Sequence, residues 1–175
     1  MRTEFYKLVK NNFILSFGFF LVSIIFGIFL KDLICDFYID VPYDVLKDVE
    51  LVTSLNYGYV IFFGAVLPIL LSLIMFVFRH ELSVGSIKRL RIAFYNIFLG
   101  SLILLLYAVY VNLYTLLCLI SDPTTPMASI DNDKFGGNYL IGFIIRTFAN
   151  LFIGIGLTWI IIQLWLNIRK EVKRK

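Results

Sequence analysis

Four long apolar segments follow one another along the chain, and the short segments between them carry nearly all of the charge. The apolar segments cover positions 13–30, 57–78, 92–120 and 145–168. Each is close to or above the roughly 20 residues with which a helix crosses a hydrocarbon core of about 30 Å. The pattern therefore predicts an all-α fold, a polytopic bundle of four transmembrane helices that forms one membrane domain over residues 1–175.

The charged residues indicate an orientation for these spans. Lysine and arginine gather before the first span, in the segment 79–91 and after the fourth span, whereas 31–56 and 121–138 are acidic. Because short loops rich in these basic residues stay on the cytoplasmic side, we expect both termini and the loop 79–91 inside the cell, and both acidic loops outside. The bilayer is thus the first expected partner, and a bacterial inner or plasma membrane is the expected location. The net charge of +4 follows from this topology and gives no indication of nucleic-acid binding.

The first external loop contains aspartates at every fourth position. The members of this acidic group considered as ligand-attracting are Asp36, Asp40, Asp44 and Asp48. The simpler interpretation is a solvated outer face, and the alternative is attraction of a cationic peptide or ion.

Apolar residues at helical spacing run through the same loop. Val45, Leu46, Val49 and Val52 follow Pro42, which suits the first turn of a helix. We therefore expect a short amphipathic helix on the outer surface.

A few residues inside the spans suit helix packing or bending. They are Ser23, Gly27, Pro68, Gly154 and Thr158. Small residues let helices approach closely, and a proline in mid-span bends its helix. A substrate pathway through the same residues is the alternative interpretation.

Little in the chain indicates catalysis. The single histidine, His80, has no second histidine or cysteine near it to complete a metal site, and no phosphate-binding G-x-x-x-x-G-K-[ST] motif is present. We expect a non-enzymatic protein without metal or cofactor. Cys35 and Cys118 are both placed near the outer side and could form a disulfide, and Arg146 is expected to anchor the fourth span at the headgroups.

Two segments resemble parts of a known family. Glu4–Lys10 lies just ahead of the first span, and Glu81–Lys88 reads E-x-x-x-G-S-I-K after the second. They resemble permease subunits of the type-2 exporter class of ATP-binding-cassette transporters, in which a similar stretch forms a coupling helix that touches a cytosolic ATPase. The resemblance implies partner contacts at Glu81, Gly85, Ser86 and Lys88. It covers about the first hundred residues, and since those permeases usually have six spans, another membrane subunit would have to supply the rest.

Two alternatives stay open. The first is a stand-alone four-span protein that confers immunity to a pore-forming toxin or modulates a defence or secretion system, since pore-forming-colicin immunity proteins resemble this chain in size and layout. The second is a homo-oligomeric channel, although no span has a polar face long enough to line a water-filled pore.

Overall fold

A computed structural model describes the backbone of residues 2–37, 43–79 and 82–172 and the side chains of 3–29, 43–79 and 82–169. The elements are α1 (Arg2–Phe37), α2 (Tyr43–Ile61), the π-helical segment η1 (Phe62–Val66), α3 (Leu67–Val77), α4 (Val84–Ser121), α5 (Met127–Asp133) and α6 (Tyr139–Val172). Four stretches are long and apolar enough to cross a membrane, namely those in α1, in α2 through α3, in α4 and in α6. The predicted all-α fold, with four helices able to span a membrane, is confirmed. This arrangement is that of a multi-pass membrane protein.

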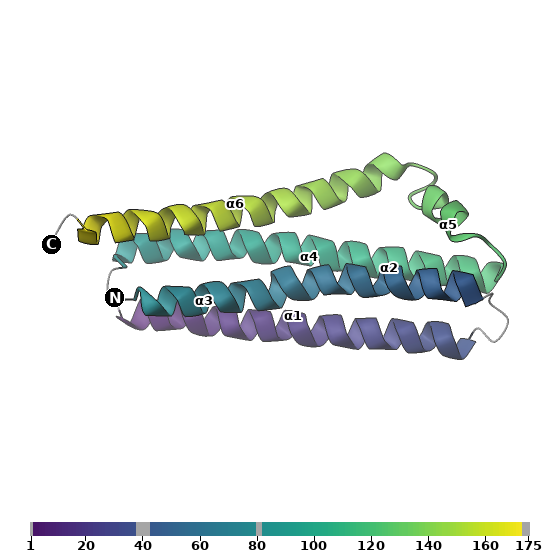
Figure 1. The fold of residues 1–175 in the computed structure, drawn as a ribbon, viewed down its shortest axis with the longest axis horizontal. Coiled ribbons are helices and arrows are strands. Elements are labelled where there is room, and N and C mark those ends of the chain that lie inside the picture. Colours follow the sequence, from purple (N-terminus) through teal and green to yellow (C-terminus); the bar gives the residue numbers. More distant parts are fainter. Residues whose placement is uncertain (1, 38–42, 80–81, 173–175) are drawn as a thin grey trace.

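The long helices lie side by side and alternate in direction (Figure 1). α1 begins and α6 ends at the same end of the bundle, and the short α5 lies at the opposite end. α4 is the central helix, because it packs along most of α6 and also contacts α1 and α2. α6 therefore joins the bundle chiefly through α4.

The contact between α4 and α6 depends on two glycines that face each other's helix. A Cβ atom on Gly100 would lie 2.5 Å from the carbonyl oxygen of Ala149, and one on Gly156 would lie 2.6 Å from that of Ala93. Since no side chain separates the two backbones at these points, the helices approach as closely as small residues permit in membranes.

Gly154 and Thr158, which the sequence suggests as packing residues, lie on the exposed face of α6. A Cβ atom on Gly154 would have no neighbour within 4 Å. Two helical positions correspond to a rotation of about 200°, so Gly156 rather than Gly154 points toward α4. The close packing inside this chain is thus carried by Gly156.

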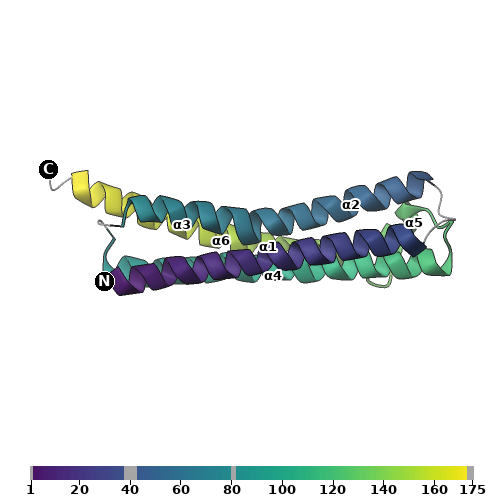
Figure 2. The same cartoon turned by 90° about the horizontal axis from the view of Figure 1, so that it is seen from below.

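The second span changes direction where η1 separates α2 from α3 (Figure 2). The Leu67 amide donates to the carbonyl of Phe62, five residues earlier, which is the π-helical pattern. Pro68 follows directly and is buried. Because a proline ring clashes with the carbonyl four residues before it, the wider turn accommodates the ring, and Pro68 is found next to the bend.

Buried hydrogen bonds tie neighbouring helices together. Asn12 Nδ2 donates to Ser72 Oγ (3.1 Å), Thr53 Oγ1 to Asn112 Oδ1 (3.3 Å) and Ser86 Oγ to Asn167 Oδ1 (3.4 Å). These bonds join α1 to α3, α2 to α4 and α4 to α6. Interhelical bonds of this kind contribute roughly 0.6 kcal/mol each in membrane proteins, so they fix the register of the helices more than they add stability.

The helices extend well into the predicted external loop 31–56. α1 continues to Phe37 and α2 begins at Tyr43, so the expected separate amphipathic helix is the start of α2. Val49 is buried in a cluster with Leu119 of α4 and Ile130 of α5. The apolar face thus has protein partners, and it packs inside the bundle instead of lying on the membrane surface.

Candidate functional site

The described part of the inferred coupling segment Glu81–Lys88 forms the beginning of α4 and is not a separate helix. Ser83 is the N-cap of α4, and its hydroxyl accepts a hydrogen bond from the Ser86 amide. Gly85 and Lys88 are exposed in the first turns, whereas Ser86 is buried. Glu81 lies outside the described residues.

The predicted acidic residues and Cys118, where they are described, lie toward the opposite end of the bundle (Figure 1). Asp44 and Asp48 are exposed near the start of α2, while Asp40 and the side chain of Asp36 lie outside the described residues. Among the described side chains, no group of three potential ligands could hold a metal ion. Cys118 forms no disulfide within the described part of the chain, and the side chain of Cys35 lies outside it, so the disulfide between them stays a prediction.

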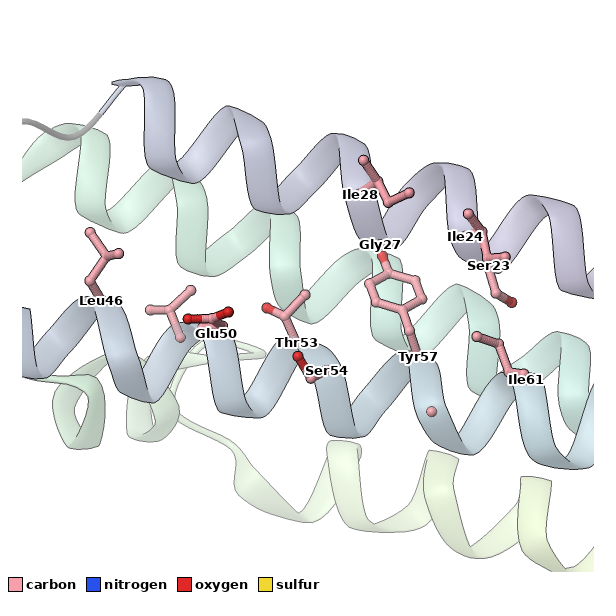
Figure 3. Close-up of a pocket in the computed structure, with 12 residues that line it drawn as sticks. Ser23, Ile24, Gly27, Ile28, Leu46, Glu50, Thr53, Ser54, Tyr57 and Ile61 are labelled. Atoms are coloured by element: carbon pink, nitrogen blue, oxygen red, sulfur yellow. The ribbon is translucent and has the colours of Figure 1, made fainter.

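A cleft of about 460 Å³ lies between α1 and α2. Figure 3 shows side chains of the two helices pointing toward each other across it. Its accessible surface is mostly apolar, although small or polar residues contribute to the lining: Ser23 and Gly27 on α1, and Glu50, Thr53, Tyr57 and Gly58 on α2. Ile24, Ile28 and Ile61 supply apolar walls. Ser23 and Gly27, suggested by the sequence for packing, thus both face this cleft.

Two hydroxyl groups at the cleft are buried without a hydrogen bond within 3.5 Å in the described part of the chain, and the side-chain amide of Asn112 on α4 lies next to one of them, that of Tyr57. The two hydroxyls belong to Ser23, which is 0% exposed, and Tyr57, which is 4% exposed. The Tyr57 ring packs 3.6 Å from the position of a Cβ on Gly27. A buried polar group without a partner costs roughly 1–3 kcal/mol, and such groups are few in native structures. The cleft thus holds unused hydrogen-bonding capacity.

One wall of the cleft is the least buried of the long helices. Of the most apolar stretch of α1, 17% is buried inside the structure, against 44% for α4. The small residues Gly27, Ser54 and Gly58 leave room for the backbone of another helix to approach. The arrangement therefore offers van der Waals surface, unused hydroxyls and an acidic residue, Glu50, at the end nearer α5.

Sequence reasoning identified only the α1 side of this site. Thr53 falls in the predicted external loop 31–56, and Tyr57 is the first residue of the predicted second span, so hydropathy alone does not single them out. Their spacing of one helical turn is the signal that identifies them once α2 is continued toward Tyr43. Comparison with protein-family models, with curated proteins and with solved structures gives no match.

Proposed function

We propose that this protein is a non-enzymatic, stand-alone membrane protein of the immunity or accessory kind, which acts by binding a membrane-spanning helix of another polypeptide between α1 and α2. The observation that carries the proposal is the open cleft beside α1, with the hydroxyls of Ser23 and Tyr57 buried in its wall without a hydrogen bond within 3.5 Å in the described part of the chain. In a bilayer no water replaces a missing partner, so a polypeptide that bonds to these groups gains binding energy that lipid chains cannot supply.

The shape of the cleft favours a helix as the occupant. Its lining on α2 runs from Leu46 to Ile61, which is about 22 Å at 1.5 Å per residue. Glu50, Ser54 and Gly58 succeed one another at one-turn intervals along this lining. A third helix can follow such a row closely because small residues admit its backbone and hydroxyls bond to it.

The charge at the end nearer α5 indicates what flanks that helix. Asp44 and Asp48 are exposed at the start of α2, next to the end of the cleft. An acidic rim attracts positive charge, so the partner helix is expected to carry lysine or arginine where it leaves the membrane on this side.

Removing the Tyr57 hydroxyl is expected to weaken partner binding without lowering the stability of the protein. Tyr57→Phe should leave the free energy of unfolding in detergent unchanged or raise it by up to about 1 kcal/mol, because it removes a buried group without a partner. The same change should weaken capture of the partner by roughly 2- to 10-fold, the equivalent of one hydrogen bond. Thermal unfolding and quantitative co-purification measure the two effects. A less stable Tyr57→Phe protein would mean that the hydroxyl is already satisfied within the chain.

A permease-like subunit of an ATP-driven exporter is the second candidate, and it rests on the resemblance at Glu81–Lys88. The supporting observation is that Gly85 and Lys88 are exposed together at the start of α4. Among the described residues, a Cβ atom on Gly85 would contact only Ser83 Oγ, at 3.9 Å, so a soluble partner could approach the backbone there.

Gly85→Trp tests this second candidate. If an ATPase docks at this surface, the substitution should reduce its co-purification at least tenfold while membrane insertion is kept, because the indole would occupy the space next to the exposed backbone. Gly154→Trp, at another open position, is the matched control. Absence of an ATPase from the wild-type preparation, or equal recovery with Gly85→Trp, would remove the exporter from consideration.

A further inference from the structure

A second polar region lies between α2, α4 and α6, on the α5 side of the bundle and apart from the α1–α2 cleft. It consists of two cavities of about 230 and 330 Å³ that share Asn56, Tyr107 and Arg146 as lining residues. Asn150 lines the first cavity, and Lys134 lines the second. Two cations and two side-chain amides thus belong to one continuous polar wall.

Arg146 has no acidic partner among the described side chains. Its guanidinium lies over the ring of Tyr107, 5.5 Å from the ring centroid. Asp131, the acidic residue of the same region, forms an ion pair with Lys134. The cavity wall therefore carries one positive charge in excess, which favours an anionic ligand.

The position of Arg146 along α6 matches the level of lipid headgroups. Arg146 and Arg169 lie on one continuous helix, about 34 Å apart at 1.5 Å per residue. The hydrocarbon core of a bilayer is about 30 Å thick, so the spacing of the two arginines matches the separation of its two boundaries. Each guanidinium stacks on an aromatic ring, Arg146 on Tyr107 and Arg169 on Trp165.

The loop before α6 contributes to the wall of the second cavity, next to Arg146. Phe135 has a positive φ of 58°, which is unfavourable for a bulky residue, and its ring stacks 4.6 Å from Tyr110 and 6.2 Å from Tyr107. A Cβ atom on Gly142 would lie 3.2 Å from this ring. Such strain persists where the surroundings hold it in place and is frequent at ligand sites.

We propose that this polar region binds the phosphate of an anionic phospholipid in the leaflet on the α5 side. The planar guanidinium of Arg146 can donate two parallel hydrogen bonds to phosphate oxygens. The amide groups of Asn56 and Asn150 can add further donors, and the exposed apolar face of α6 can contact the acyl chains. The inference is independent of the helix-binding cleft, which is lined by other residues.

The test is retention of phosphatidylglycerol by the full-length protein in detergent, measured by native mass spectrometry. We expect Arg146→Gln to lower the bound fraction at least fivefold and Arg146→Lys, which keeps the charge but not the planar fork, to lower it less. Arg169→Gln is the matched control, because it removes the same side chain from a similar ring contact at the other end of α6.

Three results would overturn the assignment. Equal retention by wild type and Arg146→Gln would show that the arginine does not hold the lipid, and equal losses in the Arg146→Gln and Arg169→Gln proteins would show only general surface charge. Complete displacement of phosphatidylglycerol by millimolar inorganic phosphate would assign the region to soluble phosphate instead of lipid. Unchanged thermal unfolding of Arg146→Lys shows that any loss of lipid is not a loss of fold.

Discussion

Gly156→Ala is expected to lower the free energy of unfolding in detergent by about 2 kcal/mol, because the added methyl group has no space between α4 and α6. Its Cβ would lie 2.6 Å from the carbonyl oxygen of Ala93 and 2.7 Å from Ile97 Cγ1. A backbone oxygen inside a helix cannot turn aside as a side chain can, so the two helices must separate. Thermal or denaturant unfolding of the purified protein measures the loss.

Gly154→Ala is the control, since it adds the same methyl group to the same helix at a position with no neighbour within 4 Å. Its stability should equal that of the wild type or exceed it slightly, because alanine favours helix over glycine. Gly100→Ala should resemble Gly156→Ala, and the double mutant should lose less than the sum, because one separation of the helices relieves both clashes. If Gly154→Ala were the more damaging change, the described rotation of α6 would be incorrect.

Filling the α1–α2 cleft is expected to abolish capture of a membrane partner, with at least a tenfold loss for Gly58→Trp. Gly58 lines the cleft, and a Cβ atom there would meet nothing within 4 Å. The Trp side chain therefore leaves the backbone into open space, and its indole occupies the space in the cleft that a partner helix needs. Co-purification in mild detergent, quantified by mass spectrometry, gives the result.

Gly154→Trp again serves as the control, because it places the same bulky group at an open position on α6, which does not line this cleft. Both variants should keep wild-type thermal unfolding. Partner recovery that is unaffected by Gly58→Trp, or reduced equally by the two substitutions, would argue against the α1–α2 cleft as the binding site.

The sequence predicts the fold because bilayer thickness imposes a length that is visible in the apolar runs. It predicts the limits of the helices less well. The charged residues of 31–56 suggest a loop, yet helix α2 begins at Tyr43, since Val49 and its neighbours find apolar partners on α4 and α5. Hydropathy reports where a helix can enter lipid, and tertiary contacts determine where the helix begins.

The site is predicted only in part for a related reason. Small residues such as Ser23, Gly27 and Gly154 are recognisable in the sequence, but which helix they face depends on rotations that a periodic apolar pattern does not determine. A Cβ on Gly27 would meet the ring of Tyr57, whereas one on Gly154 would meet nothing within 4 Å in the described part of the chain. The missing hydrogen-bond partners of Ser23 and Tyr57 become visible only when both helices are placed together.

The most direct test of helix binding is site-specific photo-crosslinking in intact cells. A photoreactive amino acid at Ser54, an exposed residue of the cleft, is compared with one at Gly154 on α6. We expect an adduct from Ser54 that joins this protein to a membrane-spanning segment of another polypeptide, that is absent from Gly154, and that disappears with Gly58→Trp. Adducts formed equally from both positions, or an adduct between two copies of this 20.3 kDa chain alone, would contradict it.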